Sequence, residues 1–241
     1  MSGSATEPDS GIHAALFDVD GTLLSTGGAS DRAWRRAFDQ LYAVPVEVSD
    51  YTGTGITDPE VGIESFRGAL GREPSRRELA RLMGLRLRHL PEEVETSPGY
   101  RVMPGVEELL HRLSDEGLLL GLITGNVEAA AHIKLARANL NRYFTFGGYG
   151  SDATERVDVA RRALERAERV AGGGLERTAC VAVGDTPHDV DAGHGAGIKV
   201  VGVATGDYDV AALRGGGADF AIPSLEEWPP GLDGNAPGGP G

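Results

Sequence analysis

Apolar and polar residues follow two different patterns along this chain. At its start, and again beyond residue 100, short apolar runs typical of strands buried on both faces alternate with segments of helical spacing. We expect strands over residues 12–17, 118–124, 143–146, 179–183, 199–204 and 218–222, and helices over 104–114, 127–140, 155–171, 187–196 and 210–214. Strands that alternate with helices predict a parallel sheet, so the expected fold class is α/β with a Rossmann-like sheet.

The stretch between these two parts shows only helical spacing. Apolar residues recur every three or four positions over 31–41, 58–70 and 75–90, and no strand is expected there. Ser75 followed by Glu78 has the pattern of a capping box and marks a helix start. This stretch is therefore predicted to be all-helical.

Two breaks bound the helical stretch. Gly27–Gly28 and Pro98–Gly99 interrupt the pattern and have the composition of hinges. An insertion between two parts of one sheet is then expected to form a separate cap. The predicted organisation is an α/β core formed by 12–27 and 101–226, a helical cap at 28–100, a disordered lead at 1–11 and a disordered tail at 227–241.

The composition excludes several classes of partner. The 241 residues carry 36 acidic and 23 basic side chains, and this net charge of −13 disfavours nucleic acid or an anionic membrane as a partner. No apolar run is long enough to span a bilayer, and the first ten residues lack the pattern of a signal peptide. The only cysteine, Cys180, excludes an intramolecular disulfide, so we expect a cytoplasmic protein. A monomer or a small homo-oligomer is expected.

The first strand ends in two carboxylates. Asp18 and Asp20 are separated by one residue, and alternate side chains of a strand leave on the same side. Two like charges so placed are unfavourable unless a cation or a shared proton relieves them. Taken alone, the pattern is also that of a strand that ends in a polar turn.

Two further strand ends carry polar residues to the same edge of the predicted sheet. The segment Thr124-Gly125-Asn126 follows one strand and Gly184–Asp189 follows another, although each alone is also typical of a helix cap. Ligands of such sheets bind at the carboxyl ends of the strands, where four carboxylates would crowd without a cation. Mg²⁺ relieves this crowding, and Thr124 with the neighbouring N–H groups of a helix N-terminus forms an anion cradle. A cation-backed carboxylate that faces such a cradle suits attack on a phosphoryl group.

With these motifs, the chain resembles a hydrolase of the haloacid dehalogenase superfamily, of the phosphoglycolate-phosphatase-like kind with an α-helical cap. The resemblance covers about residues 12–222. Its most specific parts are the motifs at 17–23 and 183–193, continued at 196–197 and 201–206.

The resemblance implies a role for each of these residues. Asp18 corresponds to the nucleophile, and Asp20 to the acid that protonates the leaving oxygen and later, as a base, activates water. Mg²⁺ would be held by Asp18, the backbone carbonyl of Asp20 and Asp185, with Asp189 nearby or acting through water. The segment Thr124-Gly125-Asn126 would bind the phosphoryl group.

One departure from the family pattern concerns its third motif, which is usually a lysine near the start of the helix after the third strand. No lysine occurs there, and Arg156 is the expected substitute for phosphate binding. Lys134 is a second, weaker candidate, because it lies well along the preceding helix. The alternative for Arg156 is a solvated arginine on a helix that carries several others.

Several chemistries compete on this scaffold. Asp20 disfavours dehalogenation, which dispenses with a second aspartate, and the cap has no lysine to form a Schiff base. We expect a Mg²⁺-dependent phosphatase that hydrolyses a small phosphate monoester, phosphoglycolate-like or a sugar phosphate, through an aspartyl-phosphate. A phosphomutase of the β-phosphoglucomutase type remains an alternative, as does a catalytically silent binding or regulatory member.

The cap is expected to recognise the leaving group. Residues 52–58 resemble the cap segment that approaches the substrate in this family, although a loop before a helix cap is an equal interpretation. Arg67, Arg86 and Arg88 have the charge to meet an anionic substrate, but an exposed position is favoured for each. His188 is expected either to line the pocket or to lie on the surface.

Overall fold

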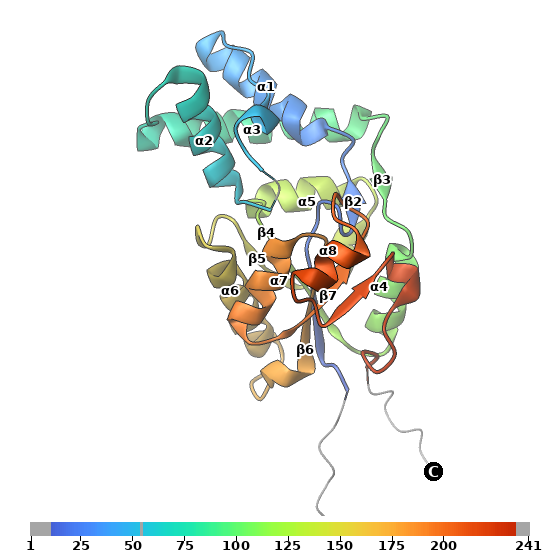
Figure 1. Cartoon of the computed structure of the whole chain (residues 1–241). Coiled ribbons are helices and arrows are strands. Elements are labelled where there is room, and N and C mark those ends of the chain that lie inside the picture. Colours follow the sequence, from blue (N-terminus) through green and yellow to red (C-terminus); the bar gives the residue numbers. More distant parts are fainter. Residues whose placement is uncertain (1–10, 54, 235–241) are drawn as a thin grey trace, which may run out of the picture.

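A six-stranded sheet, all of whose neighbouring strands are parallel, forms the centre of the larger lobe in this computed structural model, which describes residues 11–53 and 55–234 (Figure 1). The expected α/β class is confirmed. In spatial order the strands are β5 (Phe146–Tyr149), β4 (Leu119–Thr124), β1 (Ala14–Phe17), β6 (Cys180–Gly184), β7 (Lys199–Val203) and β8 (Phe220–Ile222). Because β1 lies between β4 and β6, the carboxyl ends of these three strands are neighbours.

The alternation of side chains along β1 divides the core into two layers. Ala15 and Phe17 lie in one apolar cluster with helices α4 (Val106–Asp115) and α5 (Glu128–Ala136), whereas Ala14 and Leu16 lie in the other. The second layer is formed by α6 (Arg156–Val170) and α7 (Pro187–Ala196). Burial on both faces explains the continuous apolar character of the strand.

The remaining short elements of the core complete the lobe. Helix α8 (Val210–Gly215) packs against β7 and β8. The 3₁₀ turns are η2 (Leu140–Tyr143), η3 (Arg177–Ala179) and η4 (Leu225–Glu227).

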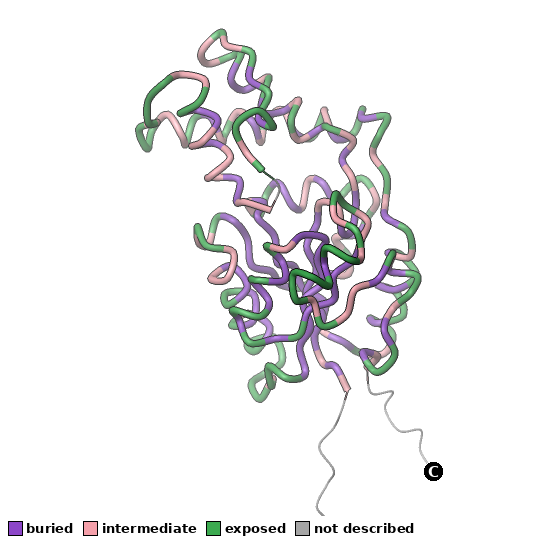
Figure 2. Tube along the Cα trace, viewed as in Figure 1, coloured by how far each residue is buried: buried purple, intermediate pink, exposed green. Residues whose placement is uncertain are grey.

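The smaller lobe is helical, as the sequence predicts. It contains α1 (Ala29–Tyr42), α2 (Asp58–Leu70), α3 (Arg76–Thr96) and the 3₁₀ turn η1 (Val48–Asp50), and among the described residues between 29 and 96 there is no strand. Its own apolar core, the purple interior of the upper lobe in Figure 2, includes Trp34, Phe38, Phe66 and Leu82. The capping box of Ser75 and Glu78 is present at the start of α3. We expect a cap with its own core to behave as one rigid unit.

The two linkers between the lobes lie side by side. Strand β2 (Leu24–Ser25) pairs with β3 (Arg101–Val102) in an antiparallel ribbon. Just above it, Gly27 has a left-handed φ of 59° and its α-carbon lies against the backbone of Gly99, so closely that a side chain at Gly27 would meet that backbone. The Ser97 hydroxyl also donates to the carbonyl of Thr26 at 2.7 Å. The two expected hinges are therefore in direct contact.

Two regions differ from the sequence expectation. The strand expected over 143–146 is β5 at 146–149, because the apolar residues before it form η2 and the strand itself contains two glycines. Residues 228–234, expected to be disordered, pack on the core: Trp228 stacks on Phe17 with ring centroids 6.5 Å apart, and Leu232 is buried. The remainder of the expected lead and tail, 1–10 and 235–241, lies outside the described residues.

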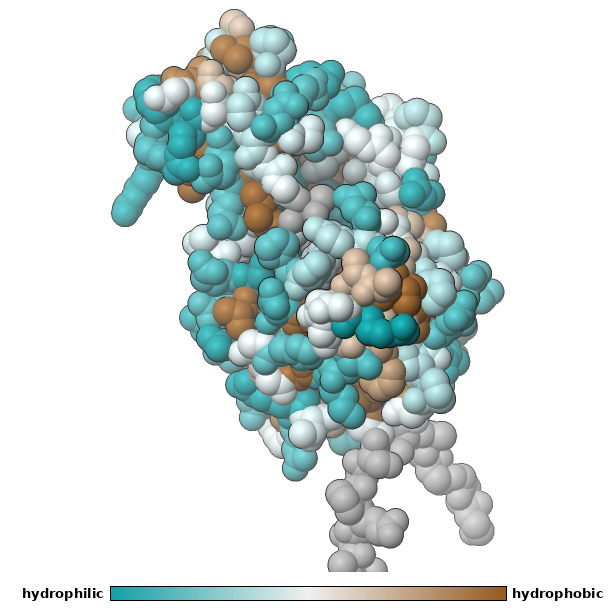
Figure 3. Space-filling model, in the orientation of Figure 1, coloured by the Kyte–Doolittle hydropathy of each residue, from teal (hydrophilic) through white to brown (hydrophobic). Residues whose placement is uncertain are grey.

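The face of the molecule in Figure 3 is mostly hydrophilic, with hydrophobic residues scattered singly or in small groups. Of the helices in the described part of the chain, none has the length and apolar character needed to cross a membrane. Cys180 is buried, and burial raises the pKa of its thiol to about 11.

Candidate active site

A cavity of about 480 Å³ lies between the cap and the carboxyl ends of the core strands. Its floor contains the expected residues from β1, β4 and β6 together with Arg156 from α6. Its cap side includes Trp34, Val48 and Ile56. Of the predicted catalytic, phosphate-binding and metal-binding residues, all except Asp189 therefore line one cavity.

Three carboxylates form the first half of the site. Oxygen atoms of Asp18, Asp185 and Asp189 all lie within 4.8 Å of one another, and each residue is at most 9% exposed. Gly21 and Gly206 make this approach possible, because a β-carbon at either position would meet the carboxylate of Asp185. The backbone is thus shaped around a dense group of acidic oxygens.

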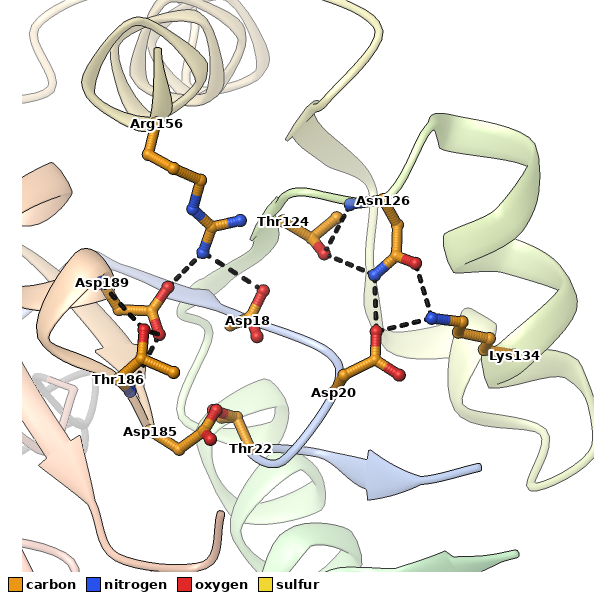
Figure 4. Close-up of polar contacts among 10 residues, drawn as sticks. All are labelled: Asp18, Asp20, Thr22, Thr124, Asn126, Lys134, Arg156, Asp185, Thr186 and Asp189. Carbon is orange, nitrogen blue, oxygen red and sulfur yellow. Dashed lines mark hydrogen bonds and ion pairs between the residues drawn. The ribbon is translucent and has the colours of Figure 1, made fainter. Parts of the chain in front are cut away.

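Arg156 is the cation that faces this group (Figure 4). Its Nη2 lies 3.4 Å from Oδ1 of Asp18 and also contacts Oδ1 of Asp189. The Arg156 side chain is about 10% exposed and projects from the first residue of α6. Arg156 is therefore placed beside the expected nucleophile and is not on the solvated face of its helix.

One guanidinium does not neutralise three carboxylates. Burial, followed by the charge of Asp189, raises the pKa of Asp18 to about 7, although Arg156 opposes the shift. Burial and the charges of Asp18 and Asp189 raise the pKa of Asp185 to about 8. Groups that hold protons for lack of positive charge, with oxygens converging on one point, fit a hard divalent cation.

Two members of the carboxylate group also have structural partners. Asp189 accepts hydrogen bonds from the N–H (3.1 Å) and hydroxyl (2.7 Å) of Thr186, which completes the capping box at the start of α7. Asp185 accepts a hydrogen bond from the Thr22 hydroxyl at 2.9 Å. Both carboxylates are held in place before any ligand binds.

Asp20 lies in the second half of the site, directed away from the three carboxylates (Figure 4). Its Oδ2 accepts hydrogen bonds from Nζ of Lys134 at 2.6 Å and from Nδ2 of Asn126 at 2.7 Å. Partial removal from water would raise the pKa of Asp20, whose side chain is 41% exposed, but the ammonium of Lys134 and these hydrogen bonds outweigh that effect and lower the pKa below its usual value. The pKa of Asp20 is thus shifted down, whereas those of Asp18 and Asp185 are shifted up.

The expected phosphate cradle follows β4. Oγ1 of Thr124 accepts hydrogen bonds from the N–H (3.2 Å) and side-chain amide (2.8 Å) of Asn126, so the hydroxyl retains its own hydrogen to donate. The N–H of Asn126, expected to face an anion, is therefore engaged inside the segment. At Gly125 a β-carbon would meet the carbonyl of Ile56, so the cap lies directly over the cradle.

Asp58 of the cap joins this segment. Its backbone N–H donates to the carbonyl of Gly125 at 2.7 Å, and its Oδ2 accepts from the N–H of Val127 at 2.8 Å. The same Oδ2 pairs with Arg86 at 2.7 Å. The N-terminal end of α5 is thus held by a cap carboxylate.

The cap arginines separate into two kinds. Arg67 and Arg88 are exposed, as expected, whereas the exposed position expected for Arg86 is wrong. Arg86 is fully buried because it pairs with Asp58 and stacks over the ring of Trp34. In the segment 52–58, expected to approach the substrate, Gly53, Gly55 and Ile56 line the cavity, and Thr54 lies outside the described residues. His188 is exposed and lies against Gly55.

Sequence reasoning missed the pairing of Lys134 with Asp20. A signal was present, because Lys134 interrupts the apolar face of α5 formed by Ala130, Ala131 and Leu135. A lysine on a buried helix face needs a partner. Which carboxylate supplies it depends on how α5 sits against the loop after β1, and helical spacing does not encode that.

The chain is similar to known proteins in both sequence and structure. Residues 12–197 match the model of the haloacid dehalogenase-like hydrolases. The chain is 30% identical over 196 residues to the phosphoglycolate phosphatase of Mesorhizobium japonicum, covering 80% of this chain and 83% of the relative. It is 29% identical over 201 residues to that of Agrobacterium fabrum, covering 83% and 84%. Among solved structures, CbbY from Rhodobacter sphaeroides in complex with phosphate superposes with a TM-score of 0.71 at 21% identity, over 90% of this chain and 96% of that one.

Proposed function

The chain belongs to the haloacid dehalogenase-like hydrolases and is a phosphatase, and from this premise we propose that it hydrolyses small phosphate monoesters, phosphoglycolate-like or sugar phosphates, through an aspartyl-phosphate on Asp18. The observation that carries the assignment is the buried group of three carboxylates facing Arg156, with Asp20 beside it. Arg156, beside Asp18, is placed to bind the oxygens of a phosphoryl dianion. The cavity has room for a small leaving group.

In the proposed reaction, a carboxylate oxygen of Asp18 attacks phosphorus and the bond from phosphorus to the ester oxygen breaks. Asp20 gives its proton to that oxygen as the alcohol leaves. Asp20 then takes a proton from water, which attacks phosphorus and releases inorganic phosphate and free Asp18. The cycle leaves the enzyme unchanged.

Arg156, the hydroxyl of Thr124 and the N–H of Gly125 are proposed to hold the phosphoryl oxygens. Asn126 contributes by orienting Thr124, since both of its hydrogen bonds to Oγ1 leave the Thr124 hydrogen directed elsewhere. The guanidinium has planar, fixed donors that match the oxygens of a phosphoryl group.

Mg²⁺ is the proposed cofactor, held by Asp18, Asp185, Asp189 and the backbone carbonyl of Asp20. The oxygens of three buried carboxylates are the donors that a hard divalent ion prefers, and the single guanidinium leaves part of their charge for such an ion to neutralise. When bound, the ion neutralises negative charge on the nucleophile and on the phosphoryl group.

Asp20 must be protonated for the first step and ionised for the second. Its pairing with Lys134 favours the ionised form in the free enzyme. A bound phosphoryl dianion brings negative charge close to Asp20 and favours proton uptake, which prepares the acid. Donation of this proton to the leaving alcohol restores the carboxylate, which then acts as the base toward water.

The proposed partner is thus a phosphorylated small molecule in the cytoplasm, and no nucleic acid. A net charge of −13 disfavours nucleic-acid binding, and the lone buried Cys180 suits a reducing compartment.

The test is hydrolysis of 4-nitrophenyl phosphate and of a panel including phosphoglycolate and sugar monophosphates, with and without Mg²⁺. We expect Mg²⁺-dependent release of phosphate, and loss of turnover in D18N with the fold retained by circular dichroism. Net isomerisation of a sugar phosphate without phosphate release would identify a phosphomutase. Turnover by D18N, or none by the wild type, would contradict the proposal.

A further inference from the structure

Lys134 is a buried cation whose only effect in the proposed reaction so far is electrostatic, on the ionisation of Asp20. Its side chain is only 2% exposed, although an ammonium is costly to remove from water. It is one of only two lysines in the chain, the other being Lys199. A charge kept in such a position requires compensation nearby.

The compensation comes from one atom of Asp20 and one of Asn126. Nζ of Lys134 lies 2.6 Å from Oδ2 of Asp20 and 2.6 Å from Oδ1 of Asn126. Asn126 in turn donates from Nδ2 to the same Oδ2 of Asp20. The three side chains form a closed triangle of hydrogen bonds that fixes the carboxylate of Asp20.

The triangle engages only one oxygen of the carboxylate. No hydrogen bond from the described residues reaches Oδ1 of Asp20, and this leaves Oδ1 to exchange a proton. The helix that carries Lys134 is itself held, since the Tyr100 hydroxyl donates to the carbonyl of Lys134 at 2.8 Å. The backbone that carries Lys134 is therefore tied to the linker at Tyr100.

We propose that Lys134 is the positioning residue for Asp20: through Nζ it holds Oδ2, so that Oδ1 points at the oxygen of the leaving alcohol. This rests on the proposed function, because it assigns a role in the same proton transfer. Lys134 itself need not touch the substrate. Proton transfer requires alignment of donor and acceptor, so a free Asp20 rotamer weakens general acid catalysis even where the residue is retained.

The proposal is tested with K134M and a pair of substrates. A dinitrophenyl phosphate has a leaving group that departs without protonation, whereas an alkyl phosphate requires the acid. The value of kcat/KM covers the steps up to departure of the alcohol, so its ratio between the two substrates reports the general acid. K134M is expected to lose about 10²-fold on the alkyl ester, in the range of a general acid, and less than about tenfold on the aryl ester.

The matched control is K199M, which removes the exposed lysine at the start of β7 and is expected to behave as the wild type on both esters. K134Q keeps a polar group in the buried position, should K134M fail to fold, and is expected to shift the ratio in the same direction. In a D20N background, the K134M change is expected to cost little more, because the residue it positions is already disabled.

Two failures are distinguishable. If the wild type hydrolyses neither ester with Mg²⁺, the proposed function falls and this inference with it. If the wild type is active and the Lys134 variants lose equally on both esters, or lose nothing, only the role of Lys134 is overturned.

Discussion

The two halves of the site use the same residue type in opposite electrostatic conditions. Asp18, Asp185 and Asp189 are buried together and only Asp18 and Asp189 contact the guanidinium of Arg156, so burial and mutual repulsion raise the pKa of Asp18 to about 7 and that of Asp185 to about 8. Asp20, two residues from Asp18, pairs with the ammonium of Lys134, and this pairing lowers the pKa of Asp20. What differs is the helix that reaches each half: α6 and α7 for the first, α5 for the second.

This division has a chemical meaning. Titratable neighbours whose environments separate their pKa values take different roles in catalysis. We expect the first half to receive a cation and the second to move a proton. Substitutions that change one half and leave the other intact test whether the two halves have separate roles.

The largest expected effect comes from Arg156, the one cation of the first half. R156A removes a donor to the phosphoryl oxygens and is expected to lower kcat by about 10²–10³-fold, as loss of an oxyanion donor does elsewhere. Steady-state kinetics on 4-nitrophenyl phosphate measure this. R161A, on the exposed face of the same helix, is the matched control and is expected to retain activity. Full activity in R156A would remove Arg156 from the site.

A smaller effect is expected for Asp185. D185N removes one oxygen donor and one charge, and should raise the Mg²⁺ concentration for half-maximal activity by at least about 10²-fold, because even indirect partners of metal ligands contribute 10–100-fold. A Mg²⁺ titration of activity gives the value. D191N changes an exposed aspartate on α7 and serves as the control. An unchanged Mg²⁺ requirement in D185N would contradict the division.

The smallest effect is a pH dependence of stability. In the folded, metal-free protein, Asp18 and Asp185 hold protons that the unfolded chain, with pKa values near 3.8, has released. Their contribution to the free energy of unfolding is complete below about pH 4 and is lost as pH rises through 7 and 8. Stabilisation by added Mg²⁺, which needs the ionised carboxylates, is therefore expected to increase from pH 6 to pH 8.

Differential scanning calorimetry at several pH values, with and without Mg²⁺, checks this expectation. Each kcal/mol of difference corresponds to about 2–4 °C in Tm for a chain of this size. In D185N the rise of the Mg²⁺ effect with pH should flatten. A Mg²⁺ effect that shrinks from pH 6 to pH 8 would contradict the raised pKa values.

The fold was largely predictable because its signals are local. Apolar runs identify β1, β4 and β6, and the all-helical texture between two breaks identifies the cap. β5 was misplaced, since Gly147 and Gly148 replace the apolar side chains that mark a strand; a β-carbon at Gly148 would meet the backbone of α6. The many Pro and Gly residues around Trp228 and Leu232 predict a disordered tail, and two apolar residues are too few to change that prediction.

The site was predictable in part for a different reason. Asp18, Thr124 and Asp185 lie at strand ends, and parallel strands bring their ends to one edge. The partners of Lys134 and Arg86 come from packing between elements distant in the chain. Their charges suggested solvent or substrate, and only the placement of α5 and α3 shows that each is buried against a carboxylate.

The ribbon of β2 and β3 limits how the cap can move. Two separate tethers would leave the cap free to tilt, twist and slide over the cavity. Because the two linkers are hydrogen-bonded to each other and Gly27 touches Gly99, we expect the pair to resist twisting and to permit bending. We therefore expect the cap to move mainly by this one bending motion, which brings Ile56 and Asp58 back to the same place over Gly125.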